Sequence, residues 1–506
     1  MTSANRHSPE RCIPCSGCLR MAKSIKINFI LNAIRTFCSI AFPVFTFAYV
    51  SRILDVQGIG MFDYARSIVS YFVLIAQLGI STYGMREIPK VKHDKSKLSN
   101  LVAELFCFNV IATVISYILF FGTLMSVGKF DSYRSLLLIN SLSIGFCALG
   151  LEWMYGALEE YKYITIRTIV FQIISFTLLL LFVREKSDIY IYAAISVLSS
   201  AGSNILNFIH AKNYIESPVV KISNMFRHIK PIFLFWGNNI TSTLYLLIEI
   251  TLLGWLCDNL SVGLYSASNK ICRIFISLVV AICPILLSRS SSYLANGRID
   301  EYNNLSRQSL GIITLVSVPI TVFLFCFSKD IILLFCGDSF LPAVSLSKIM
   351  SLLMIIIPVS SFLSMQILIP YGKEGQIFKI LFIATLFNTI LSLVFIPKYQ
   401  YTAASIINVS TELLILILYV FISNKIMPIL RIFDKLWHYF IAGMLQLICT
   451  LCIYNNSSSS ISFFNLIFSA VLGIFVYVSV LAVVKNELFL MIVNSITIKN
   501  DRCNGK

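Results

Sequence analysis

The sequence is dominated by a succession of apolar segments, most of them about twenty residues long, separated by short polar stretches. A helix that crosses the hydrocarbon core of a bilayer needs about 20 mostly apolar residues. A strand of a transmembrane barrel is about half as long and alternates in polarity. The sequence therefore predicts an all-α polytopic membrane protein with about 14 (12–14) transmembrane helices. The candidate spans are 27–50, 60–83, 101–124, 133–155, 164–183, 188–209, 231–254, 264–288, 308–328, 343–369, 374–396, 401–423, 437–454 and 461–484.

Composition excludes two other classes of protein. Hydrophobic residues make up 57% of the chain and charged residues only 13%, whereas about a quarter of a soluble domain is charged. A soluble enzyme and a disordered chain are both excluded. The net charge of +16 is spread in clusters between the apolar segments, so we expect no nucleic-acid partner.

The lysines and arginines predict the orientation in the membrane. With a cytoplasmic N-terminus, 26 of the 40 fall in inside segments and only six in outside loops. Positive charge is retained on the cytoplasmic side. Both termini are therefore predicted to be cytoplasmic.

A short internal repeat indicates two related halves. Residues 59–68 read IGMFDYARSI and residues 262–271 read VGLYSASNKI, which aligns Gly60 with Gly263 at an offset of 203 residues. Six predicted spans separate the copies, so both have the same orientation, as in transporters built from parallel repeats. We expect two pseudo-symmetric six-helix lobes plus two C-terminal helices. The predicted divisions are an N-terminal extension at 1–20, lobes at 21–222 and 223–430, and the last two spans with a tail at 431–506.

The first twenty residues contain three closely spaced cysteines, Cys12, Cys15 and Cys18. Their spacing suits a metal ion, but a structural zinc site needs a fourth ligand, and none is near. Met21 opens a basic segment of the kind that precedes a first span. We interpret residues 1–20 as an extension from an upstream start codon and expect no metal site.

Motifs for catalysis are missing. The sequence contains no phosphate-binding GxxxxGK[ST] loop, no HExxH and no GxSxG. The histidines all lie at or beyond the ends of spans, where we expect them to be solvated or interfacial. They are His7, His93, His210, His228 and His438. We therefore expect no catalytic residue and no cofactor.

Charged residues within the spans are the strongest functional signal. A charge at the bilayer centre costs between about 2.5 and 17 kcal/mol, so such residues normally face a cavity. Arg35, Arg66, Lys270 and Arg273 lie at or near apolar helix interiors in both predicted lobes. They predict a cationic cavity for an anionic substrate; the alternative is that some of them extend to an interface.

Polar residues also follow one face of two predicted helices. On the first span, Asn28, Asn32 and Ser39 share a face with Arg35, at i, i+4, i+7 and i+11 spacing. On the seventh span the same spacing joins Asn238, Ser242, Tyr245 and Glu249. These stripes are predicted to face a lumen.

Three further carboxylates are assigned roles. Glu249 and Asp63 are candidates for binding a coupling ion. Glu152 lies at the predicted C-terminal end of its span, where the helix dipole opposes a negative charge. We expect it to form a structural ion pair with Arg167.

Three stretches resemble bacterial O-antigen flippases (Wzx-type) of the multidrug/oligosaccharidyl-lipid/polysaccharide exporter superfamily. They are FAYVSRILDVQGIGMFDYARSIVSYFVLIAQLGISTYGMREIPKVKHDKSKLSNLVAELF at 47–106, LEWMYGALEEYKYITIRTI at 151–169 and VGLYSASNKICRI at 262–274. The resemblance runs from about Met21 to past residue 420. Two positions depart from it: Asp55 stands where the family often has glycine, and Glu249 where aspartate is common.

The resemblance implies a function without covalent chemistry. A flippase of this kind moves an undecaprenyl-pyrophosphate-linked oligosaccharide repeat unit across the bacterial inner membrane by alternating access between two lobes, driven by a proton or sodium gradient. We expect as partners the lipid-linked oligosaccharide, the lipid bilayer and other membrane proteins of polysaccharide assembly. The alternatives are a multidrug or other small-molecule antiporter of the same superfamily, and a membrane-bound glycan polymerase. A drug antiporter would have an acidic cavity, and a polymerase would need a long external loop.

Overall fold

The computed structural model describes residues 16–216, 222–428, 436–456, 463–486 and 489, and in this part of the chain the regular structure is helical throughout. The earlier helices are α1 (Ser16–Gln77), α2 (Ile80–Val91), α3 (Lys95–Ser126), α4 (Arg134–Ala148), α5 (Glu152–Ala157), α6 (Tyr161–Phe182), α7 (Ile189–Val197), α8 (Asn204–Ala211) and α9 (Ile222–Leu256). The later helices are α10 (Asn259–Val280), α11 (Ile282–Ala295), α12 (Ile299–Cys326), α13 (Ser328–Cys336), α14 (Ala343–Met350), α15 (Leu353–Phe362), α16 (Glu374–Asn424), α18 (Trp437–Asn456) and α19 (Phe463–Val483). Short 3₁₀ segments η1 (Gly128–Tyr133), η2 (Lys186–Asp188) and η4 (Asp338–Phe340) and π segments η3 (Leu198–Gly202) and η5 (Leu363–Leu368) interrupt or join them.

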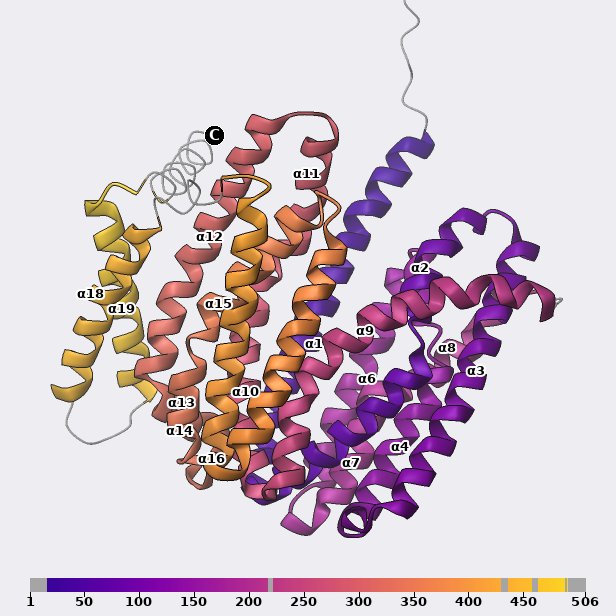
Figure 1. The fold of residues 1–506 in the computed structure, drawn as a ribbon, viewed down its shortest axis with the longest axis horizontal. Helices are drawn as coiled ribbons and strands as arrows, with labels where there is room; N and C mark the ends of the chain where they lie inside the picture. Colours follow the sequence, from indigo (N-terminus) through magenta and orange to yellow (C-terminus); the bar gives the residue numbers. More distant parts are fainter. Residues whose placement is uncertain (1–15, 217–221, 429–435, 457–462, 487–488, 490–506) are drawn as a thin grey trace, which may run out of the picture.

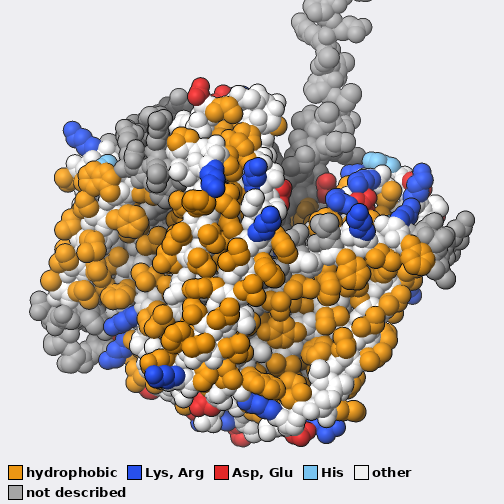
Figure 2. Space-filling model, in the orientation of Figure 1, with side chains coloured by type: hydrophobic (Ala, Val, Ile, Leu, Met, Phe, Trp, Pro, Cys, Tyr) orange, Lys and Arg blue, Asp and Glu red, His pale blue; other side chains and the backbone are white. Residues whose placement is uncertain are grey.

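The apolar runs form helices of membrane-spanning length. Within the described residues, eight helical segments are long and apolar enough to cross a bilayer, and three shorter apolar helices accompany them. Large hydrophobic side chains cover much of the outer surface of the bundle (Figure 2). An apolar surface of this extent belongs against lipid. The all-helical, multi-pass membrane architecture is thus confirmed, while the total of about fourteen spans stays a prediction.

Two of the long helices contain a sharp break where the sequence predicts two spans. In α1 the break is at Asp55, whose φ is 63°, and in α16 it is at Gln400, whose φ is 48°. The Asp55 carboxylate accepts a hydrogen bond from the backbone N–H of Val56 at 2.7 Å and one from Lys186 at 3.0 Å. With a ψ of 177° this is a strained conformation that glycine adopts far more readily than other residues, and the two hydrogen bonds help to hold Asp55 in it.

The helices form two groups, one containing α2–α8 and the other containing α10–α16, and the groups meet where α1 packs on α10 (Figure 1). The groups lie apart at the end of the bundle that carries α2 and the α11–α12 turn, and converge at the end that carries α13 and α14. At the convergent end, a Cβ atom on Gly60 would lie 1.7 Å from the carbonyl oxygen of Asn259 and 2.8 Å from the nitrogen of Gly263. The two glycines that the repeat aligns therefore lie in contact, where the backbones approach too closely for any side chain.

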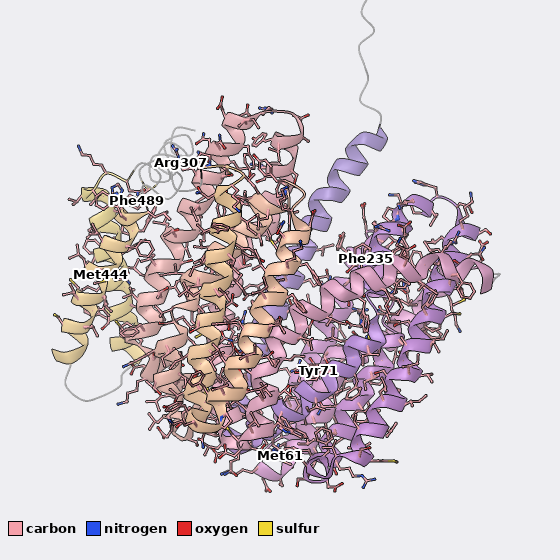
Figure 3. All side chains as sticks on the ribbon, in the orientation of Figure 1. Met61, Tyr71, Phe235, Arg307, Met444 and Phe489 are labelled. Carbon is pink, nitrogen blue, oxygen red and sulfur yellow. The ribbon has the colours of Figure 1, made fainter. Side chains whose placement is uncertain are left out.

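Helix α9 links the two groups. Its earlier part contacts α2, and Trp236 donates a hydrogen bond to the backbone oxygen of Leu74 at 3.0 Å. Its later part packs on α16, and Thr251 is 2.8 Å from the hydroxyl of Tyr71 on α1, which Figure 3 labels near the centre of the bundle. Phe235, also labelled in Figure 3, lies on the earlier part.

Candidate substrate cavity

Three neighbouring cavities, with polar and apolar side chains on their walls, lie beside α1. The central cavity, of about 470 Å³, lies where α1, α6 and α7 face α10. A middle cavity of about 220 Å³ shares Arg66, Ser196 and Ser200 with it. A third cavity of about 530 Å³, which we call the α5 cavity, shares Gln77 and Asn204 with the middle one. Because neighbouring cavities share walls, we treat them as one hollow that extends from α10 to α5.

The central cavity brings together three of the four predicted cations, Arg66, Lys270 and Arg273. Lys270 donates to both carboxylate oxygens of the buried Asp63, at 2.8 and 2.6 Å. Arg273 lies 3.6 Å from the carboxylate of Glu412. Two of the three positive charges are therefore balanced by nearby carboxylates. The sequence did not predict these pairs, because the partners are far apart in the chain: Asp63 and Lys270 are separated by 207 residues.

Arg66 differs from the other two cations. Its side chain is exposed, it lines both the central and the middle cavity, and within the described residues it forms no ion pair. An arginine stays protonated at any physiological pH and offers five N–H donors in a fixed plane. Its charge is therefore available to an anion in the hollow.

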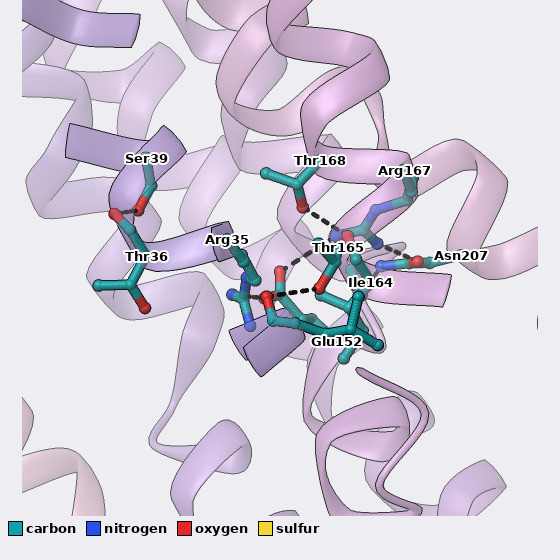
Figure 4. A network of polar contacts seen from close by, with 11 residues as sticks. Arg35, Thr36, Ser39, Glu152, Ile164, Thr165, Arg167, Thr168 and Asn207 are labelled. Carbon is teal, nitrogen blue, oxygen red and sulfur yellow. Dashed lines mark hydrogen bonds and ion pairs between the residues drawn. The ribbon is translucent and has the colours of Figure 1, made fainter. Parts of the chain in front are cut away.

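Arg35, the fourth predicted cation, lies elsewhere. It lines the α5 cavity and forms an ion pair with Glu152 (Figure 4). Glu152 also lies 3.4 Å from the buried Arg167, which donates in turn to the side-chain oxygen of Asn207. The expected contact between Glu152 and Arg167 is present. Together with Arg35 and Asn207, these residues form a network of four side chains.

Of the uncharged residues on the two predicted lumen stripes, only the side chain of Ser39 is described. This residue lines the central cavity, with its hydroxyl donating to the backbone oxygen of Thr36 at 2.8 Å. The other members of the stripe lie on α1 and α9, but their side chains fall outside the described residues. They are Asn28, Asn32, Asn238, Ser242 and Tyr245. Cys12, Cys15 and Cys18 likewise have no described side chain, and the described residues contain no cluster suited to a metal ion.

Glu249 lies in a separate buried cluster between α9, α10 and α16. Its side chain is only 1% exposed, and it accepts hydrogen bonds from Asn388 and Asn408, both at 2.7 Å, and from the hydroxyl of Tyr265. All three hydrogen-bond donors are neutral. Asp63, the other candidate for ion binding, forms an ion pair with Lys270.

Most of the wall of the hollow is uncharged and was missed in the sequence. A charged residue within a span is rare and therefore indicates a function, whereas single serines and amides are common in apolar helices. The sequence does not show which of them face a cavity, because that depends on how the helices pack. The signal that could have found them is their recurrence at similar depth on several spans. The uncharged polar residues of the middle cavity are Ser70, Gln77, Asn140, Ser143, Ser196, Ser200 and Asn204.

Known proteins with similar sequences agree with the expected class. The profile of the polysaccharide biosynthesis protein family matches residues 25–287, and the MatE profile matches residues 236–398. A protein of Escherichia coli (strain K12) named "Putative O-antigen transporter" is 22% identical over 394 residues, which cover 78% of this chain and 95% of that protein. One of the same name from Shigella dysenteriae is 20% identical over 406 residues, covering 78% and 98%.

A solved structure shows the same fold. The lipid II flippase MurJ in an inward closed conformation superimposes with a TM-score of 0.73 over 91% of this chain and 99% of MurJ, at 17% sequence identity. The resemblance to Wzx-type flippases of the exporter superfamily is thereby confirmed. Because one family profile spans more than half of its length, the chain belongs to the polysaccharide biosynthesis protein family.

Proposed function

We propose that this protein translocates an undecaprenyl-pyrophosphate-linked O-antigen or polysaccharide repeat unit across the bacterial inner membrane. The observation that carries the proposal is Arg66: an exposed arginine in the middle of an apolar helix, with no ion-pair partner in the described part of the chain, on the wall that two cavities share. The names of the relatives support a lipid-linked glycan as the class of substrate.

The chemistry of the substrate explains why a protein is needed. A pyrophosphate carries about two negative charges, each of which is costly in hydrocarbon. Charge-assisted hydrogen bonds from Arg66 replace part of the water and counterions that the pyrophosphate leaves behind. Lys270 and Arg273 line the same cavity from α10 and can contribute when the substrate competes with Asp63 and Glu412. The polyprenyl tail stays in lipid, so the cavity has to enclose only the polar head.

Alternating access fits the arrangement of the two helix groups. The groups are in backbone contact at Gly60 and Gly263 and lie apart at the opposite end. With the orientation that the lysines and arginines predict, the separated end is cytoplasmic, the side on which a lipid-linked repeat unit would be loaded. Translocation then requires the contact between α1 and α10 to open while the other end closes.

We assign coupling to an ion gradient to Glu249. A buried carboxylate whose hydrogen-bond donors are neutral has a large desolvation cost when ionised, and a proton or a small cation relieves that cost. The charge of Arg273 also acts on Glu249, but Arg273 forms an ion pair with Glu412. The cluster joins α9, the helix that links the two groups, to α10 and α16. Binding or release of a cation there can therefore change how these three helices pack.

Complementation of a flippase-null strain tests the function. Arg66→Ala is expected to abolish surface polysaccharide while membrane protein levels stay normal. Arg66→Lys is expected to retain part of the activity, because a point charge still attracts pyrophosphate although the planar pair of donors is lost. Full complementation by Arg66→Ala and Lys270→Ala at normal protein levels would contradict the proposal.

A small-molecule antiporter is the second candidate, because the MatE profile matches residues 236–398. That function predicts efflux of a cationic dye or drug. The net positive charge of the central cavity disfavours such a ligand: three cations face it, and the nearby carboxylates balance two. Cation efflux that depends on Arg66, without any effect on surface polysaccharide, would favour this candidate.

A further inference from the structure

We propose that the hollow is divided by ligand chemistry: the wall around Arg66 holds the pyrophosphate, and the middle and α5 cavities hold the sugars and select among them. This inference rests on the proposed function and deepens it by locating the glycan. It makes the helices before α9 responsible for glycan selectivity. Its starting point is the uneven lining of the hollow.

Among the described residues, the later helices contribute to one of the three cavities. The described residues that line the middle and α5 cavities lie between Arg35 and Asn204. The central cavity adds a face from α10, which carries Lys270 and Arg273. A head group anchored at Arg66 therefore has two further cations on the α10 side and the uncharged polar side chains of the middle cavity on the other side.

The middle cavity suits hydroxyl groups better than a second phosphate. Apart from Arg66, the polar side chains on its walls are serine hydroxyls and amides of Gln and Asn. Each of these groups both donates and accepts hydrogen bonds, as sugar hydroxyls do. A phosphate only accepts, so amide oxygens on the wall would be left facing it without a donor. A single cation followed by several amides and hydroxyls is therefore complementary to a phosphate followed by a sugar.

The α5 cavity continues this wall with one ion pair exposed on it. Arg35 and Glu152, whose side chains are 30% and 42% exposed, form that pair, and Arg167, which also pairs with Glu152, is buried and does not line the cavity. Asn109 donates from its amide nitrogen to the backbone oxygens of Cys147 and Ala148, at 3.5 and 3.2 Å, which fixes its amide orientation. Among the described residues, its buried side-chain oxygen has no hydrogen-bond partner. Tyr161 adds an aromatic ring with a hydroxyl.

The size of the α5 cavity fits a small-molecule ligand. Its volume of about 530 Å³ lies within the range of about 300–1,000 Å³ that is usual for such sites. The middle cavity, at about 220 Å³, is smaller and lies between this space and Arg66. A glycan that extends from the pyrophosphate would therefore pass Gln77 and Asn204, which line both cavities, before it reaches the α5 cavity.

Gln77 is the residue at which this division can be tested. Gln77 is the last residue of α1, and its side chain is exposed. It lines both the middle cavity and the α5 cavity. Gln77→Leu removes its hydrogen-bonding groups and leaves Arg66 untouched. Gln57→Leu is a matched control, because Gln57 is also exposed on α1 and lines none of the three cavities.

The experiment compares two probes on the purified protein in nanodiscs. One is undecaprenyl diphosphate without sugar, and the other is the lipid-linked repeat unit extracted from a flippase-deficient strain of the source bacterium. Wild type and Gln57→Leu should bind the glycosylated probe more tightly than the sugar-free one. Gln77→Leu should weaken only the glycosylated probe, by about three- to tenfold, as expected for one or two lost hydrogen bonds.

The outcomes separate this inference from the proposed function. Equal affinity of wild type for both probes, or equal weakening of both probes by Gln77→Leu, would overturn the location of the glycan. Arg66→Ala should lose both probes. If Arg66→Ala binds undecaprenyl diphosphate as wild type does, the proposed function fails at its first step, whatever Gln77→Leu shows.

Discussion

The contact between Gly60 and Gly263 offers a prediction whose size can be worked from the structure. An ideal Cβ on Gly60 would lie 1.7 Å from the backbone oxygen of Asn259, and ordinary contacts begin at 3.4 Å. The shortfall is 3.4 − 1.7 = 1.7 Å, and neither atom can rotate away, because the Cβ is fixed to one backbone and the oxygen belongs to the other. Forcing extra atoms into a well-packed site costs about 1–3 kcal/mol when side chains can adjust, and more when they cannot. We therefore expect Gly60→Ala to lower the stability of the folded protein by at least about 3 kcal/mol.

A matched control is available within the same protein. Gly122 lies inside α3, and a Cβ there would meet nothing within 4 Å. Alanine is favoured over glycine in a helix by about 0.5–1 kcal/mol, so Gly122→Ala should leave stability unchanged or raise it slightly. The two substitutions add the same methyl group, and they should differ by about 4 kcal/mol because only one of them meets a backbone.

The assay is the apparent melting temperature of each purified variant in detergent, followed by size-exclusion chromatography, with membrane protein levels measured in parallel. Gly60→Ala should melt well below wild type, and Gly263→Ala should behave alike, because its Cβ would lie 2.1 Å from the backbone oxygen of Val56. Gly122→Ala should melt at or above the wild-type temperature. If Gly60→Ala and Gly122→Ala melted at the same temperature, the direct contact of α1 with α10 would be refuted.

Two further predictions follow from single contacts, and a third follows from the predicted orientation. Lys270→Met should destabilise the protein by about 3 kcal/mol, because it leaves the buried Asp63 charged and unpaired; adding Asp63→Asn should recover much of the melting temperature, and no recovery would contradict the pairing. His228→Phe should cost about 1.5–3 kcal/mol, since the ring lies 2.7 Å from the hydroxyl of Tyr83 and 2.8 Å from the carboxylate of Glu104; an unchanged melting temperature would show that this cluster does not hold α9. Reporter fusions after residue 26 and after residue 485 should both be inactive as periplasmic markers, and an active one at either point would overturn the predicted orientation.

The sequence alone was sufficient for the membrane class and for part of the cavity. Apolar length predicts helices because only helices and closed barrels satisfy the backbone in a bilayer, and barrel strands are shorter and alternate in polarity. The repeat aligned Gly60 with Gly263, and the structure places these residues in contact. The depth of Arg66 and Lys270 in apolar sequence indicated a polar interior, and both line the central cavity.

The partners of the charged residues could not be predicted in the same way. The position of a residue within an apolar run indicates its depth in the membrane. It does not show how the helix is rotated against helices that are distant in sequence. Asp63 thus remained a free candidate for ion binding until Lys270 was found beside it. His228 was expected at an interface, yet its side chain is buried against Glu104. The uncharged wall at Gln77 was missed because single amides carry no charge signal.

Translocation by the purified protein is the most direct test of the central claim, that Arg66 admits a lipid-linked pyrophosphate to the hollow. Wild type and Arg66→Ala are reconstituted separately in proteoliposomes that carry the extracted lipid-linked repeat unit, and the fraction that a membrane-impermeant lectin or glycosidase can reach is followed over time. Wild type should expose substrate from the inner leaflet, and Arg66→Ala, at equal protein content, should expose no more than empty liposomes do. Equal rates for wild type and Arg66→Ala would contradict the account.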